Sequence, residues 1–187
     1  MKKINHQFLN HIPDWEINYL FLGTFNPSTG PTVNYFYGRS KNQTWNILSK
    51  IFNVDFDVQN KGLFFPQLKT CKIACLDIIS SVEVPNERIA FVEGKGYKDS
   101  AIINNYVKRE YNIDNILSII SKNNCKVFST WGKGSNNQNW LTEISKIPNI
   151  ITLVSPSMAA YVPKGTIKFQ YMLSDWSSKI KPNPTQV

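Results

Sequence analysis

Two short polar loops, residues 23–28 and 155–157, contain residue types that could build a ligand site. The first reads Gly-Thr-Phe-Asn-Pro-Ser and the second Ser-Pro-Ser, and each directly follows an apolar run that is typical of a buried strand. In an open α/β sheet, the loops at the carboxyl ends of the strands form the ligand crevice. We therefore expect these two loops, which are far apart in the sequence, to meet at one site.

A third segment, residues 34–45, lies between these loops and mixes aromatic, cationic and amide side chains. It reads Asn-Tyr-Phe-Tyr-Gly-Arg-Ser-Lys-Asn-Gln-Thr-Trp. Aromatic rings stack on flat ligands, and arginine and lysine side chains pair with phosphates. This composition therefore favours a planar ring that is bound beside a phosphate backbone.

Apolar runs and helical periodicity predict the elements that must position these loops. Strands are expected at residues 17–25, 73–79, 126–130 and 150–154. Helices are expected at residues 42–52, 99–111, 113–122, 135–147 and 166–179, and Ile167, Tyr171 and Trp176 of the last helix should face inward. Strands that alternate with helices predict an α/β protein with three layers, in which helices flank a central, mostly parallel sheet of about four strands. We expect one domain over residues 1–181, followed by a frayed tail at residues 182–187.

Length, composition and charge restrict the class of protein. The chain has 187 residues, of which 42% are hydrophobic and 18% charged. These values are typical of a globular domain and exclude a disordered chain. The formal net charge of +8 favours a polyanionic partner such as nucleic acid, although a solvated lysine surface that maintains solubility is an equal alternative.

The cysteines and the amino terminus indicate a cytoplasmic protein. The three cysteines, Cys71, Cys75 and Cys125, fit no zinc or iron–sulfur spacing. Buried free thiols point to a reducing, intracellular compartment. Met1-Lys-Lys is not followed by the apolar region of a signal peptide, and no apolar run reaches the length of a membrane span.

The remaining motifs give little support to other chemistries. The chain has only two histidines, His6 and His11, so a Ser/His/Asp triad or a histidine metal site is poorly supported, and both are expected at the surface or at a cap. Gly94-Lys-Gly96 and Gly132-Lys-Gly134 lack the spacing of a phosphate-binding loop and are expected to be turns. No close pair of carboxylates suggests a glycoside hydrolase.

Five motifs, in order along the chain, resemble those of the uracil-DNA glycosylase superfamily, above all its mismatch-specific uracil/thymine and hypoxanthine-DNA glycosylase branches. Residues 23–27 match a strand followed by Gly-x-x-Asn-Pro, and residues 35–45 match an aromatic and basic turn that leads to Asn-x-x-Trp. Later motifs are matched by residues 96–101, 130–132 and 155–157. The resemblance implies a monofunctional enzyme of base excision repair, which hydrolyses the N-glycosidic bond of a deaminated base, uracil or hypoxanthine, flipped out of DNA.

The resemblance also implies roles for the residues of the first loop and the helix start. Asn26 would position the attacking water, and Asn42 would contact the edge of the base. Their alternative roles are an Asn-Pro turn and a helix N-cap. Backbone N–H groups near Thr24 and Phe25 would stabilise the carbonyl of the leaving base.

Further residues would bind the flipped base and the DNA around it. Tyr37, or Phe36 if the alignment is one residue out, would stack on the base, and core packing is the alternative. Arg39 and Lys41 would meet phosphates, unless they lie in a solvated loop. The last loop would hold the DNA backbone through Ser155 and Ser157 and insert Met158 or Tyr161 as a wedge; the alternative is a strand-to-helix turn with a buried methionine.

The implied partner is DNA with a damaged or mismatched base, bound by a monomer, with no metal or other cofactor. The chain departs from the family pattern at Ser28, where glycine often follows Asn-Pro, at Arg39-Ser-Lys41, and at Ser155, where the fastest uracil-specific branch has histidine. These departures leave the identity of the base open. A non-catalytic nucleic-acid-binding module, or a hydrolase of small nucleosides or nucleotides, remains an alternative function.

Overall fold

The centre of the molecule is a four-stranded parallel sheet with the strand order β3-β2-β6-β7. The computed structural model describes residues 1–9, 11–29, 33–93, 99–104, 107–131 and 137–182. The strands of this sheet are β2 (Tyr19–Gly23), β3 (Ile73–Asp77), β6 (Lys126–Ser129) and β7 (Ile150–Thr152). All residues of β2 and β3 are buried, as expected for parallel strands that are covered on both faces. The predicted α/β fold class is confirmed.

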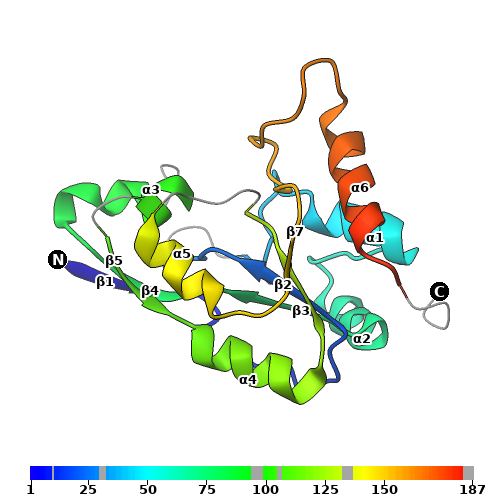
Figure 1. Cartoon of the computed structure of the whole chain (residues 1–187), viewed down its shortest axis with the longest axis horizontal. Coiled ribbons are helices and arrows are strands. Elements are labelled where there is room, and N and C mark those ends of the chain that lie inside the picture. Colours follow the sequence, from blue (N-terminus) through cyan, green and yellow to red (C-terminus); the bar gives the residue numbers. More distant parts are fainter. Residues whose placement is uncertain (10, 30–32, 94–98, 105–106, 132–136, 183–187) are drawn as a thin grey trace.

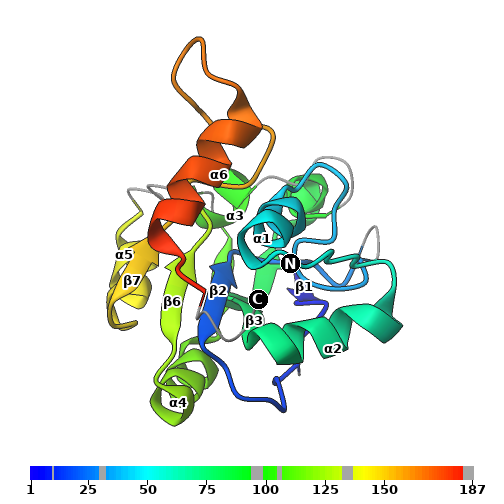
Figure 2. The ribbon, with the colours of Figure 1, turned by 90° about the vertical axis from the view of Figure 1, so that its right-hand side faces the viewer.

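Helices cover both faces of this sheet (Figures 1 and 2). One face carries α1 (Thr44–Phe52), α2 (Lys61–Cys71) and α6 (Lys168–Lys179), and the other carries α4 (Ile113–Asn123) and α5 (Gln138–Ser145). Trp45, Leu48 and Phe52 of α1 are buried at helical spacing, which explains why this segment forms a helix against the sheet. The chain leaves α1 through Asn53 in the left-handed conformation, which asparagine tolerates well.

A second sheet, which was not predicted, continues from the carboxyl end of β3. It is antiparallel, with the strand order β1-β4-β5, and consists of β1 (Lys2–Asn5), β4 (Ile79–Val84) and β5 (Lys108–Tyr111). Only Ile78 separates β3 from β4, so the expected single strand at residues 73–79 is divided between two sheets. The junction of the two sheets brings the amino-terminal segment next to the end of the parallel sheet.

Two expectations about the helices are wrong. Residues 99–111 are not one helix, because α3 (Asp99–Asn104) is short and β5 pairs with β4, and this tertiary pairing overrides the local helical pattern. In α6, Trp176 is buried as expected, but Ile167 is 64% and Tyr171 37% exposed. The reason is that Met172 and Trp176, one turn apart, form the buried stripe of α6, and Ile167 precedes the helix.

None of the helices in the described segments is both long and apolar enough to cross a bilayer.

Candidate functional site

The first polar loop leaves the sheet where β2 and β3 end together. Gly23 and Asp77, the last residues of these strands, are paired in register. The pairing continues beyond the strands, because the N–H of Ile78 donates to the carbonyl of Gly23 at 3.0 Å and that of Ile79 donates to Thr24 at 3.1 Å. The loop therefore starts beside the carboxylate of Asp77.

Asp77 is a buried carboxylate that contacts Asn26. Its side chain is 3% exposed, and its Oδ2 accepts hydrogen bonds from Nδ2 of Asn26 at 3.1 Å and from Nε2 of His6 at 2.7 Å. A side-chain amide donates through nitrogen and accepts through oxygen. Since the nitrogen of Asn26 is bound to Asp77, its Oδ1 is the atom that can accept a hydrogen bond from a water or a ligand.

His6 is not the surface or cap histidine that the sequence predicted. It is 6% exposed, and its ring stacks on Phe36 with centroids 5.5 Å apart and meets the edge of Phe25 at 5.6 Å. Nδ1 of His6 accepts the backbone N–H of Phe8 at 2.9 Å, so the proton of the neutral ring lies on Nε2, which donates to Asp77. The sequence offered no local signal for this contact, because the partners are 71 residues apart.

His11 lies at the edge of the same aromatic packing, next to Tyr35 and Phe36. It is half-buried, and its Nε2 is 3.1 Å from the hydroxyl oxygen of Tyr35. Burial lowers the pKa of His11 below its ordinary value, against the opposing effect of Asp14. This histidine is therefore part of the aromatic packing that supports the loop.

The segment after β1 holds the first loop through its main chain. The N–H of Gln7 donates to the carbonyl of Asn26 at 2.7 Å, and the N–H of Ser28 donates to the carbonyl of Asn5 at 2.8 Å. His6 and Pro27 lie opposite each other as an antiparallel bridge. Asn26 is thus held at both its backbone and its side chain.

Gly23 is required because two side chains approach it closely. A Cβ at this position would lie 2.2 Å from Oδ1 of Asp77 and 3.0 Å from the hydroxyl oxygen of Tyr37. Tyr37 itself has a φ of +58°, which is uncommon for a residue other than glycine, and its hydroxyl is 3.2 Å from Oγ1 of Thr130. Burial above all, and then Cys75 and Asp77 nearby, raises the pKa of Tyr37 well above its usual value, so the phenol is neutral.

The other aromatic candidates lie in the core. Phe25 and Phe36 are 2% and 1% exposed, and the ring of Phe36 packs between His6 and Phe8. The expectation that Phe36 could stack on a base is therefore wrong, because no face of its ring is exposed. Thr24 is 7% exposed, so Thr24 and Phe25 could meet a ligand only through main-chain groups.

Residues 41–43 and 156–158 pair through their main chains and form a second cluster. Asn42 and Ser157 form an antiparallel bridge, the N–H of Gln43 donates to Pro156 at 2.9 Å, and that of Met158 donates to Lys41 at 3.4 Å. Among the hydrogen bonds of the described segments, none joins this last loop directly to residues 23–28. Residues 36 and 37 lie between the two loops, since Phe36 packs on the ring of His6 and the hydroxyl of Tyr37 approaches Gly23.

Asn42 lies one residue before Gln43, which is the N-cap of α1. Its Oδ1 accepts the backbone N–H of Thr44 at 2.9 Å and forms an Asx turn that leads into the helix, so Asn42 does not take the alternative role of N-cap. Its Nδ2 is the group that it could offer to a ligand. Next to it, Arg39 is half-buried and Lys41 is exposed.

The last loop is largely exposed. Ser155 and Ser157 are half-buried, and their hydroxyl oxygens accept local backbone N–H groups at 3.4 Å and 3.2 Å. Met158 is 45% and Tyr161 91% exposed, so the alternative of a buried methionine is wrong. The segment between β7 and α6, which holds Tyr161, projects beyond the rest of the molecule in both views (Figures 1 and 2).

Several motif residues lie outside the described residues. They are Gly94-Lys-Gly96, the start of the segment 96–101, Gly132 at the end of the third motif, and Gly132-Lys-Gly134. Over the residues that the structure does describe, no group of three or more His, Cys, Asp or Glu side chains could hold a metal ion. The three cysteines are free, and burial raises the pKa of Cys71 to about 11.

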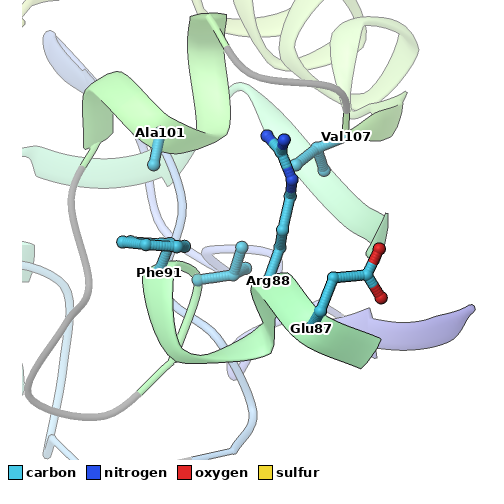
Figure 3. Close-up of a pocket in the computed structure, with 6 residues that line it drawn as sticks. Glu87, Arg88, Phe91, Ala101 and Val107 are labelled. Carbon is cyan, nitrogen blue, oxygen red and sulfur yellow. The ribbon is translucent and has the colours of Figure 1, made fainter. Parts of the chain in front are cut away.

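A cavity of about 380 Å³ lies elsewhere, between α3, β5 and the 3-10 helix η1 (Asn86–Phe91) (Figure 3). The ring of Phe91 lies below Ala101, the guanidinium of Arg88 extends toward Val107, and the carboxylate of Glu87 points away from Phe91. None of the residues that line it lies in residues 23–28, 35–43 or 155–161. Its single exposed aromatic ring and one cation form no arrangement with a recognisable chemistry.

Comparisons with known proteins assign the chain to no family. No family model matches it, and no curated protein or solved structure is significantly similar to it. The residues and their geometry therefore carry the functional argument.

Proposed function

We propose that this protein is a monofunctional DNA glycosylase that hydrolyses the N-glycosidic bond of a deaminated base, uracil or hypoxanthine. The observation that carries the proposal is the orientation of Asn26. Its amide nitrogen is bound to buried Asp77, which leaves the oxygen to accept a hydrogen bond at the carboxyl edge of the parallel sheet. This is the orientation that a residue needs to hold an attacking water, the role that the family resemblance implies.

The proposed reaction needs no cofactor. A water that donates a hydrogen bond to Oδ1 of Asn26 attacks C1′ of the sugar, the C1′–O bond forms, and the C1′–N bond breaks. The electron pair leaves on the base, and the proton that the water loses neutralises the base or passes to solvent. Backbone N–H groups near Thr24 and Phe25 would stabilise the negative charge on the carbonyl of the leaving base.

Binding of the flipped base is assigned to Tyr37, and binding of the DNA to residues before α1 and in the loop between β7 and α6. Tyr37, which is half-buried and whose neutral phenol lies close to Asp77, would stack on the base. Tyr161 and Met158 on the projecting loop would enter the gap that the base leaves, and Arg39 and Lys41 would meet phosphates. We propose that the protein acts as a monomer on DNA in the cytoplasm, and its net charge of +8 supports binding to a polyanion.

The test is base release from end-labelled DNA duplexes that each carry one uracil, one hypoxanthine or one mismatched thymine, followed by alkaline cleavage. We expect a strand break at uracil or hypoxanthine, and a single-turnover rate that falls about 10²- to 10³-fold in Asn26→Ala. The affinity of this variant for DNA should stay unchanged. Asn139→Ala, at an exposed position on α5, is the matched control and should react like the wild type.

Other outcomes would select the alternative functions. Salt-sensitive DNA binding without release of any base would indicate a non-catalytic binding module. Hydrolysis of free nucleosides without affinity for DNA would indicate an enzyme of small molecules. Either result would overturn the proposal.

A further inference from the structure

We infer that His6 and Asp77 form a buried positioning pair, which fixes the side-chain amide of Asn26 with its oxygen directed to the substrate. This inference rests on the proposed function for the role of that oxygen. Neither His6 nor Asp77 lies in any of the five motifs that resemble the glycosylase superfamily. They come from the segment after β1 and from the end of β3, on either side of the loop that holds Asn26.

The carboxylate of Asp77 selects one of the two orientations of the Asn26 amide. In the observed orientation, Nδ2 of Asn26 donates to Oδ2 of Asp77 at 3.1 Å. A half-turn of the amide would place Oδ1 of Asn26 at this distance from Oδ2, and two acceptor oxygens would then face each other in a buried environment. Such an unpaired contact is unfavourable, so the amide oxygen stays on the side away from Asp77.

His6 holds the carboxylate that makes this selection. Its Nε2 donates to the same Oδ2 at 2.7 Å, and the backbone N–H of Phe8 fixes the required tautomer through Nδ1. The ring is held by Phe36 on its face and by Phe25 at its edge. The orientation of Asn26 is therefore determined by a chain of contacts that starts at the amino-terminal segment.

The pair lies too deep to touch a substrate. The side chains of His6 and Asp77 are 4% and 3% exposed. The hollow that both of them line has a volume of about 10 Å³, which is room for no more than one water. Both are therefore positioning residues, and their effect on the reaction must pass through Asn26.

Two substitutions of His6 separate positioning from local structure. Glutamine can keep a donor in the place of Nε2, toward Asp77, whereas asparagine can keep an acceptor in the place of Nδ1, toward Phe8. We expect the single-turnover rate to fall about 10²-fold in His6→Asn and to stay within about threefold of the wild type in His6→Gln, with DNA affinity unchanged in both. A larger loss of rate in His6→Gln than in His6→Asn would mean that His6 serves only the local turn, and would overturn the inference.

A double-mutant cycle tests whether the effect passes through Asn26. Asp77→Leu keeps a side chain of similar size without an acceptor and should lower the rate about 10²-fold in the wild-type background. In the Asn26→Ala background it should lower the remaining rate by less than about twofold, because the residue to be positioned is absent. Equal losses in both backgrounds would overturn the inference.

Nuclear magnetic resonance supplies a readout that does not need catalysis. The ring nitrogens of His6 should show the neutral tautomer with the proton on Nε2, and the Asn26 amide protons should exchange slowly in the wild type and fast in Asp77→Leu. A freely exchanging Asn26 amide in the wild type would overturn the inference even for an active enzyme. A protein with these signals that releases no base would overturn the proposed function and leave the positioning pair established.

Discussion

The first and the last motif loops follow strands of the same sheet and both pair through their main chains, but only the first is also held through a side chain that is bound to a buried carboxylate. Residues 24–28 are bound along their main chain to residues 5–7, and Asn26 is also bound through its side chain to Asp77. The loop between β7 and α6 pairs with residues 41–43 through residues 156–158, and it is also anchored to α6. At its start Val154 contacts Asp175 and Trp176 of α6, and Lys168 reaches the carbonyl of Met158.

This difference matches the two tasks that we assign to the loops. Orienting one water requires a side chain held within a fraction of an ångström, which buried hydrogen bonds and packed rings can supply. Meeting DNA requires exposed apolar and cationic side chains on a projecting segment, and Tyr161 at 91% exposure is of this kind. Substitutions in the first loop should therefore affect both stability and rate, and substitutions in the last loop should affect DNA affinity alone.

The largest effect is expected for Gly23→Ala. Its Cβ would lie 2.2 Å from Oδ1 of Asp77, so the positioning pair must shift. We expect the free energy of unfolding, measured with urea, to fall by about 1–3 kcal/mol, and the single-turnover rate of base release to fall about 10²-fold. Gly62→Ala in α2 is the control, since its nearest neighbour is 3.6 Å away, and it should be neutral or slightly stabilising. A Gly23→Ala protein as stable as the wild type would show that this close approach is not required.

The next effect concerns Tyr37, where the first loop meets the expected base. Tyr37→Ala should weaken base binding by about 1–3 kcal/mol, measured as the affinity for duplex with and without the damaged base. Tyr37→Phe keeps the ring and loses only the hydroxyl contact with Thr130, so it should cost about 1 kcal/mol of stability and leave base binding unchanged. Equal binding by both variants and the wild type would remove Tyr37 from the proposed site.

Alkaline pH should destabilise the core around β3. Burial raises the pKa of Cys71 from 9.0 to about 11, and it also raises the pKa of Cys75 and Tyr37. The unfolded chain then loses these protons at lower pH than the folded protein, so this stability is present below pH 9 and is lost as pH rises toward 11. Urea unfolding at pH 8 and pH 10.5 measures the loss, and Cys71→Ala should make it smaller. A free energy of unfolding that does not change between these pH values would contradict the prediction.

The smallest effect on stability is expected at Tyr161 in the loop between β7 and α6. Tyr161→Ala removes a side chain that is 91% exposed, so the free energy of unfolding should change by less than about 0.5 kcal/mol. The affinity for damaged DNA should nevertheless fall by about 1 kcal/mol or more, measured by fluorescence anisotropy. Leu141→Ala, at a position 41% exposed on α5, should change neither quantity. A loss of stability without a loss of affinity in Tyr161→Ala would reverse the contrast between the two loops.

The sequence predicted the parallel sheet and the helices α1, α4, α5 and α6 because their signals are local, whereas α2, which contains Gly62 and Pro66, was not predicted. The apolar runs before Gly23 and at residues 150–154 correspond to β2 and β7, and the helical spacing of Trp45, Leu48 and Phe52 corresponds to α1. The second sheet escaped prediction because β1 and β5 are short and largely exposed, and because only Ile78 separates β4 from β3. Their strand character comes from pairing between segments about 80 and 30 residues apart rather than from periodicity.

The residues of the candidate site also differ in whether a local sequence signal marks them. Gly23, Asn26, Asn42 and the two polar loops could be selected as candidates from the sequence, because turn-forming residues directly after apolar runs are a local signal. That His6 and Asp77 lie beside Asn26, that Phe36 lies in the core, and which way the amide of Asn26 faces follow from the folded structure alone. Hydrogen-bond direction depends on which groups meet in space, and the contact between His6 and Asp77 spans 71 residues of the chain.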